Sequence, residues 1–191
     1  CLGLNSVCVG AESRFFNGHT NIEDNKFLIF GVKGIMDLNK KLRCAIEFNI
    51  LSYMTHQLLS VGNAVATLDE LYLFLDSPTT IEYIRNSMKR VRKRDSIVIL
   101  ASQNIEDFLI PSIREFTKPL FSIPTHQFLF NPGMVNDKEY IDALQVGQAE
   151  YDLIRSSMRG ICLYRCGNER YLLQVLAPEH KKTLFGTEGG R

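Results

Sequence analysis

Two adjacent acidic residues, Asp69 and Glu70, directly follow a short apolar run at residues 64–68. One carboxylate at the end of a strand can hold Mg²⁺ through the waters that this hard cation retains. A carboxylate one residue later points in another direction and can polarise a water for attack on a phosphate. An acid pair after an apolar run is also common in ordinary surface turns, so the pair indicates such a site only together with other residues.

A glutamine, Gln103, follows the apolar run at residues 96–101 and supplies a polar group at a second predicted strand end. Its amide carries a donor and an acceptor, so it can sense a phosphate or a water and pass a change on to Asn104. Because ligands bind beyond the carboxyl ends of parallel strands, we expect Gln103 to lie beside Asp69 and Glu70. The alternative is an exposed polar residue that merely ends a strand.

A basic cluster ends the predicted helix before that strand; it consists of Lys89, Arg90, Arg92, Lys93 and Arg94. The planar guanidinium of Arg92 fits phosphate oxygens and could be presented across a subunit boundary to a neighbour's nucleotide. An ordinary solvated helix end is the alternative, because the helix dipole favours cations there. Contact with DNA phosphates is a third interpretation, which five charges in an otherwise neutral chain support less well.

Composition excludes several other classes of protein. The chain has 191 residues, of which 45% are hydrophobic, and its formal net charge of +1 gives no general attraction to nucleic acid or acidic membranes. The five cysteines are odd in number and lack a paired CxxC pattern, which argues against disulfides and zinc, and Cys162 and Cys166 are expected to pack in the core. No metal triad of histidines, nucleophile-elbow motif or membrane-length apolar run occurs in the sequence.

Apolar runs and helical periodicity predict an alternation of strands and helices. Strands are expected at 26–32, 64–68, 96–101 and 125–130, and helices at 38–59, from Thr79 into the basic cluster, and at 104–108, 138–145 and 148–157. A hairpin of residues 160–165 and 171–176 and a helix from Pro178 follow. This order predicts an α/β fold with a mainly parallel sheet, helices on both faces, and an antiparallel hairpin near the C-terminus.

Several stretches, in this order and spacing, resemble the VirB-type conjugal-transfer ATPases of type IV secretion systems, the group that includes the TraC and TrbE proteins. The stretches are FFNGHTNIEDNKFLIFGVKGI, AVATLDELYLFL, RVRKRDSIVILASQNIEDFL and AEYDLIRSSMRGICLYRCGNERYLLQVLAPEH. The resemblance implies that residues 1–191 are the C-terminal part of a RecA-like motor ATPase domain. It assigns magnesium binding to Asp69, water activation to Glu70 and the strand-end role to Gln103. Arg92 and Lys93 are expected near phosphate or at a subunit contact.

The resemblance also implies ATP and Mg²⁺ as cofactors, identical subunits and secretion-channel proteins as partners, and a cytoplasmic location at the inner face of the cell membrane. The phosphate-binding (Walker A) loop, GxxxxGK followed by Ser or Thr, is absent from the 191 residues and is expected upstream of Cys1. We therefore expect this chain alone to bind ATP poorly and not to hydrolyse it. The alternatives are a non-catalytic domain that binds a secretion-channel partner, and an unrelated α/β domain in which the three polar residues are scattered.

Overall fold

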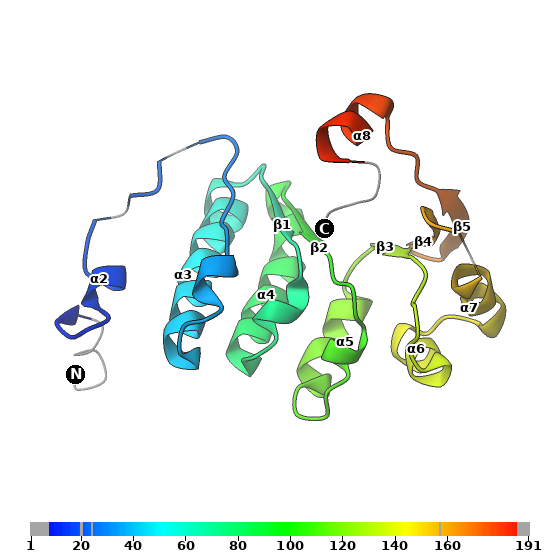
Figure 1. Ribbon diagram of the computed structural model, residues 1–191, viewed down its shortest axis with the longest axis horizontal. Coiled ribbons are helices and arrows are strands. Elements are labelled where there is room, and N and C mark those ends of the chain that lie inside the picture. Colours follow the sequence, from blue (N-terminus) through cyan, green and yellow to red (C-terminus); the bar gives the residue numbers. More distant parts are fainter. Residues whose placement is uncertain (1–7, 20, 24, 157, 187–191) are drawn as a thin grey trace. The chain divides into compact units, whose positions relative to one another are not determined.

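The computed structural model describes residues 8–19, 21–23, 25–156 and 158–186 (Figure 1). The chain divides into a first unit up to His56 and a second unit from Gln57. The first unit contains α2 (Ser13–Phe16), the 3₁₀ turn η2 (Lys33–Ile35) and α3 (Lys40–His56). Asn39 begins α3, since its Oδ1 accepts a hydrogen bond of 3.0 Å from the Leu42 N–H. The helix predicted at 38–59 is thus confirmed.

The strand predicted at residues 26–32 is wrong. This segment begins with a bend at Lys26 and Phe27, no described residue of the first unit pairs with it as a strand, and Phe27 and Ile29 are each 80% exposed. A strand exists through hydrogen bonds to a neighbouring strand, so an apolar run without such a neighbour remains a loop. The ring of Phe30 at its end contacts Tyr53 of α3, with 5.8 Å between the ring centroids.

A pair of parallel strands, β1 (Val65–Leu68) and β2 (Ile97–Leu100), forms the first sheet of the second unit. The elements around them are the π-helical turn η3 (Gln57–Val61), η4 (Leu71–Phe74), α4 (Pro78–Val91) and η5 (Arg92–Arg94). Pro78 opens α4, where a missing N–H costs nothing, and Ile81 and Ile84 are fully buried. The two strands and α4 confirm the elements predicted there.

The parallel sheet is smaller than predicted. The described residues give it two strands, and Val65, Ile97 and Ile99 on one face are between 47% and 63% exposed. An α/β fold with an antiparallel hairpin is therefore present, whereas the described part of the chain does not form a mainly parallel sheet with helices on both faces. The prediction counted residues 26–32 as a third strand, and that segment is unpaired.

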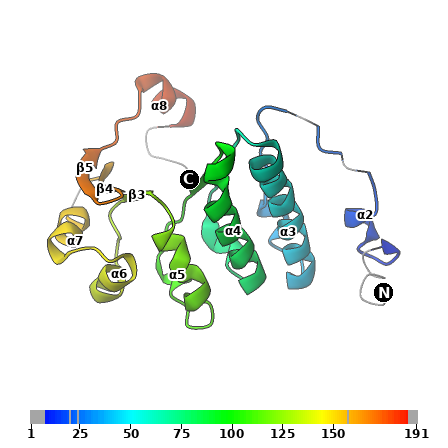
Figure 2. The same ribbon diagram turned by 180° about the vertical axis from the view of Figure 1, so that it is seen from behind.

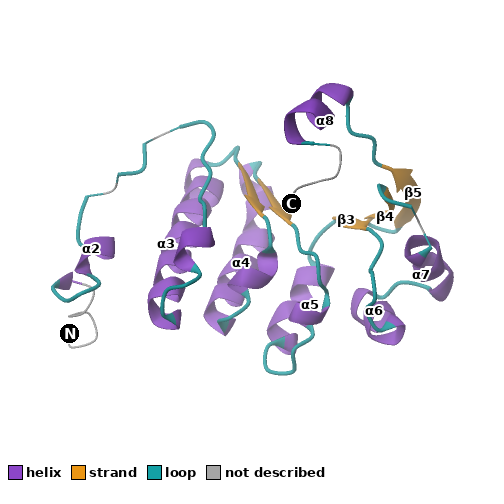
Figure 3. Ribbon diagram, viewed as in Figure 1, coloured by secondary structure: helices purple, strands orange, loops and turns teal. Residues whose placement is uncertain are grey.

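The remaining strands, β3 (His126–Leu129), β4 (Ile161–Cys166) and β5 (Glu169–Gln174), form a separate antiparallel sheet in the order β3-β4-β5 (Figure 3). The predicted hairpin is confirmed as β4 and β5, but it pairs with β3 instead of extending the parallel strands. The helices of this region are η6 (Glu106–Phe108), α5 (Arg114–Ser122), α6 (Asp137–Leu144), α7 (Gln148–Arg155) and α8 (Glu179–Phe185). In both views α6 and α7 lie side by side (Figures 1 and 2).

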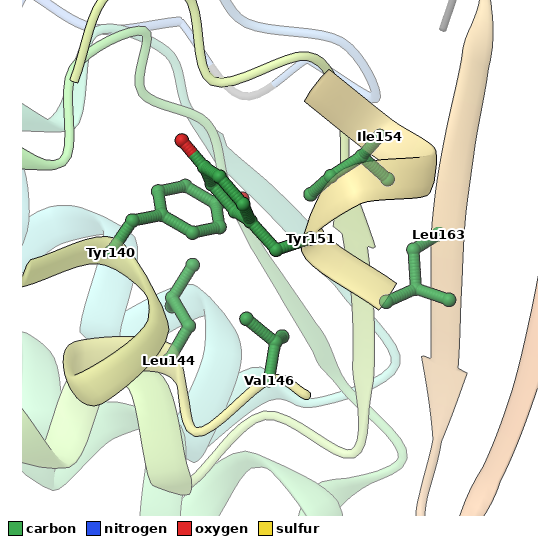
Figure 4. Packing of buried hydrophobic residues seen from close by; sticks show 6 residues of the cluster. All are labelled: Tyr140, Leu144, Val146, Tyr151, Ile154 and Leu163. Carbon is green, nitrogen blue, oxygen red and sulfur yellow. The ribbon is translucent and has the colours of Figure 1, made fainter. Parts of the chain in front are cut away.

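The antiparallel sheet packs on a cluster of apolar side chains contributed by α6, the connection between α6 and α7, α7 and β4 (Figure 4). Its members are Tyr140, Leu144, Val146, Tyr151, Ile154 and Leu163. The rings of Tyr140 and Tyr151 are tilted, with centroids 5.3 Å apart. The Tyr151 hydroxyl donates a 2.8 Å hydrogen bond to Asp137, which satisfies the polar end of a fully buried side chain. Cys162 is also fully buried, so the core-packing prediction is confirmed for it, while Cys166 is half-buried.

Candidate functional site

The chain after β1 and the chain after β2 remain hydrogen-bonded to each other beyond the sheet. The Ala101 N–H donates to the Leu68 carbonyl, and the Leu71 N–H donates to the Ala101 carbonyl, each at 2.9 Å. Asp69 and Glu70 form the short excursion between these two bonds. The predicted adjacency is confirmed, since both acids and Gln103 follow the carboxyl ends of neighbouring parallel strands.

Glu70 has a left-handed backbone, with φ of 54° and ψ of 54°. Such a conformation costs an L-residue other than Gly roughly 1–2 kcal/mol. Two contacts hold it: Asp69 Oδ1 accepts the Glu70 N–H at 3.1 Å, and the next residue is tied to Ala101. Asn63, Asp95 and Gln145 share this left-handed conformation, so it marks a tight turn at Glu70 and does not by itself assign a role.

The side-chain amide of Gln103 donates a hydrogen bond to Oε1 of Glu70. The other carboxylate oxygen, Oε2, is screened from solvent and receives no hydrogen bond from the residues that the structure describes. One oxygen of Glu70 is therefore fixed while the lone pairs of the other are not used. A carboxylate can orient a water and accept its proton, and Oε2 could do so once a water gains access to it.

Asp69 is exposed and presents its carboxylate beside Glu70. No group of three or more His, Cys, Asp or Glu side chains that could hold a metal occurs among the described residues. A cation here would thus be held by Asp69, waters and a ligand. Mg²⁺ fits such a donor set, because it binds through one or two carboxylates together with waters and substrate phosphates.

The structure does not bring Arg92 and Lys93 to these acids. Both are exposed residues of η5, which precedes the amino end of β2, whereas Gln103 follows its carboxyl end. The four residues of β2 span about 13 Å. Within its own chain, the basic cluster lies at the opposite edge of the parallel sheet from Asp69 and Glu70.

The turn that carries the cluster is anchored to the segment before β1. The carbonyl of Arg94 accepts a 2.9 Å hydrogen bond from Asn63, and a Cβ added at Gly62, where φ is +82°, would lie 3.0 Å from that carbonyl. Ser96 adds a buried link, since its hydroxyl donates to the Leu58 carbonyl at 2.9 Å. The side chains of the cluster are thus displayed from a rigid support.

A second set of polar residues, not predicted from the sequence, lines a cavity of about 660 Å³ between α5, the end of α6 and the β4–β5 turn. Its most buried charge is Arg165, a half-buried arginine in the otherwise apolar strand β4. A charged residue inside an apolar strand pattern is the signal that identifies it in the sequence.

No protein-family model matches the chain. Over 101 residues, 53% of this chain and 10% of the relative, the sequence is 32% identical to the type IV secretion system protein CagE of Helicobacter pylori. The structure matches that of VirB4 of Thermoanaerobacter pseudethanolicus with a TM-score of 0.81 and 28% sequence identity, over 94% of this chain and 50% of that one. The chain therefore spans about half of the VirB4 chain and a tenth of CagE.

Proposed function

Since the chain is similar to the VirB4-like ATPases of type IV secretion systems, we propose that it forms the C-terminal part of a RecA-like motor ATPase domain. In the full-length protein, ATP hydrolysis would drive channel assembly or the transfer of DNA or protein. The observation that carries the proposal is the contact between Gln103 and Glu70 at the carboxyl ends of two adjacent parallel strands, because ligands bind at this edge of α/β sheets.

Asp69 and Glu70 divide the work of hydrolysis in this proposal. Asp69 would hold Mg²⁺ through its waters, and the bound ion would neutralise charge on the phosphates. Glu70, with Oε1 fixed by Gln103, would orient the attacking water with Oε2 and accept its proton once the assembled site gives a water access to that oxygen. Gln103 keeps the carboxylate in that orientation and responds to a change at the phosphate.

The rest of the nucleotide site is supplied by other segments. The 191 residues contain no glycine-rich loop with the lysine and hydroxyl that phosphates and Mg²⁺ require, so the chain alone would bind ATP weakly and not hydrolyse it. Arg92 and Lys93 lie away from the acids of their own chain, which favours a role at the nucleotide of a neighbouring subunit. The proposed assembly is a homo-oligomer.

The proposed location is the cytoplasmic face of the inner membrane, with secretion-channel proteins as partners. Within the described residues, no helix combines the length and apolar character needed to cross a bilayer. DNA is a further candidate partner, supported by the five clustered cations alone. The exposed apolar side chains Val65, Ile97 and Ile99 favour the second candidate function, a non-catalytic domain that binds a channel protein.

The two functions are separated by Mg²⁺-dependent ATP hydrolysis in the full-length protein. If the chain is part of a motor, Asp69→Asn lowers the turnover rate by about a hundredfold or more, because a transition-state charge loses its counter-ion. Glu106→Gln, which neutralises an exposed carboxylate three residues after Gln103, serves as the matched control and leaves turnover unchanged. Equal turnover by both variants would remove Asp69 from the site, and a full-length protein without Mg²⁺-dependent hydrolysis would favour the interaction domain.

A further inference from the structure

The cavity between α5, α6 and the β4–β5 turn has the size of a small-molecule site. Its volume of about 660 Å³ lies within the roughly 300–1,000 Å³ that such sites usually have. It is partly open to solvent and is lined by α5, residues 123–125, Gln127 of β3, the end of α6 and the turn at Gly167 and Asn168. None of these elements carries Asp69, Glu70 or Gln103, so the cavity is separate from the candidate hydrolysis site.

Arg165 lines this cavity, and its guanidinium uses only part of its hydrogen-bonding capacity. Its Nη1 donates a 2.6 Å hydrogen bond to the Leu144 carbonyl at the end of α6. Its Nε is screened from solvent and has no acceptor, and no carboxylate of the described residues pairs with Arg165. Burial, and then the neighbouring charge of Arg170, lower the pKa of Arg165. The carboxylate of Glu150 acts in the opposite direction and raises it. Because Nε has no accessible surface, an anion in the cavity would have to approach the terminal nitrogens of the guanidinium.

Two further cations, Arg114 and Lys118, line the cavity from α5. They are four residues apart, which places both on one face of the helix, and both are exposed. The carboxylates of Glu115 and Asp142 also line the cavity, so three cations face two anions there. The remaining wall is partly apolar, with Leu109, Phe121, Ile123 and Pro124.

We propose that this cavity binds a small molecule that carries a phosphate group. The guanidinium groups of Arg165 and Arg114 and the ammonium of Lys118 would bind the phosphate oxygens, since a planar fork of N–H donors matches phosphate geometry. The apolar wall would pack against the body of the ligand. A phosphate ester fits better than an acidic peptide, because its two negative charges are concentrated on one group and the cavity has a volume of single-molecule size. This site is independent of the proposed ATPase function.

The proposal is tested by titrating the chain with inorganic phosphate, adenosine 5′-monophosphate and adenosine, with calorimetry and NMR chemical shifts as readouts. We expect saturable binding of the two phosphates and not of adenosine. Arg114→Ala and Lys118→Ala each weaken it about tenfold, because each removes a charge-assisted hydrogen bond. Asp142→Asn strengthens it, because a repulsive carboxylate is removed. Lys138→Ala, on α6 but outside the cavity lining, is the control and leaves the affinity unchanged.

Arg165→Met is a further test, but it also removes the hydrogen bond to the Leu144 carbonyl at the end of α6. Thermal unfolding shows whether this variant folds. If it does not, Arg114→Ala and Lys118→Ala alone test the proposal. The proposal is overturned if phosphate binding does not saturate or if Arg114→Ala and Lys118→Ala bind like the parent. If Glu70→Gln abolishes phosphate binding and the two α5 variants preserve it, the phosphate binds at the hydrolysis site and not in this cavity. An oligoglutamate peptide that outcompetes phosphate in an Arg114-dependent manner would assign the cavity to a protein partner instead.

Discussion

The Gln103 amide donates a hydrogen bond to the carboxylate of Glu70, although 33 positions separate the two residues. The contact follows from the register of the parallel strands, in which Leu68 lies opposite Leu100. Glu70 lies two residues after the end of β1 and Gln103 three residues after the end of β2, so both side chains reach the same edge of the sheet. A site assembled from two strand ends is held by the sheet itself, which is a more rigid support than a loop.

Replacing Arg92 by Ala distinguishes a motor residue from a solvated helix end. A surface cation there contributes only about 0.3–1 kcal/mol, so the free energy of unfolding of Arg92→Ala changes little. If Arg92 acts at a neighbour's nucleotide, ATP hydrolysis by the full-length protein falls roughly 10³-fold or more. Denaturant unfolding and steady-state turnover, measured on the same preparation, separate these effects. Normal turnover by Arg92→Ala would show that the basic cluster is an ordinary solvated helix end.

Mixing two inactive variants tests whether Arg92 acts between subunits. Arg92→Ala subunits retain Glu70, and Glu70→Gln subunits retain Arg92, so an interface between the two kinds of subunit can contain one intact site. We expect partial recovery of ATP hydrolysis in the mixed full-length protein. If hydrolysis stays as low as in either variant alone, Arg92 does not act across the interface.

The left-handed backbone of Asp95 predicts an unusual response to glycine. Asp95 follows η5 with φ of 51° and ψ of 34°, a conformation that Gly adopts without steric cost. Asp95→Gly is therefore more stable to thermal unfolding than Asp95→Ala, by about 1 kcal/mol. The exposed Asn86 inside α4 provides the matched control, because there Gly is less stable than Ala by roughly 0.5–1 kcal/mol. If the Ala variant is more stable than the Gly variant at both positions, the backbone of Asp95 is not strained.

Tyr140 predicts a loss of stability in alkaline solution. Burial, and then the neighbouring Tyr151, raise the pKa of Tyr140 from 10.0 to about 12, while Arg165 acts in the opposite direction. The folded state binds the hydroxyl proton of Tyr140 more tightly than the unfolded state does. The contribution of this proton to the free energy of unfolding is therefore fully present below pH 10 and is lost as the pH rises to about 12. The loss is at most roughly 1.4 kcal/mol per pH unit. Tyr140→Phe shows a shallower decline in urea unfolding between pH 10 and 12, and an identical slope would exclude Tyr140 as the cause.

Elements whose evidence is local were predictable from the sequence. The runs before Asp69 and Ser102 are strands because they are apolar and end at polar residues, and the hairpin follows from the turn at Gly167 and Asn168. The neighbouring position of Glu70 and Gln103 followed from the tendency of successive strands in α/β proteins to pair. Their chemical roles remain predictions.

Elements that depend on distant contacts were not predictable. The run at residues 26–32 has the composition of a strand, but pairing requires a partner that its own sequence does not reveal. Helix α5 was missed because Pro119 lies inside it. The helix persists because the buried Thr117 hydroxyl donates a 2.6 Å hydrogen bond to the Phe108 carbonyl and because Leu120 is buried. The cavity beside Arg165 is formed by segments from three parts of the chain, which no local pattern brings together.

The central claim, that Glu70 activates water in a motor ATPase, is tested most directly by Glu70→Gln in the full-length protein. The amide keeps the size of the side chain and an oxygen that can still accept the hydrogen bond from Gln103, but it cannot accept a proton from water. We predict that the Kd for ATP, measured by equilibrium binding with Mg²⁺, stays within about twofold of the parent, while the turnover rate falls by roughly 10²–10⁴-fold. Turnover equal to that of the parent, with intact nucleotide binding, would contradict the account.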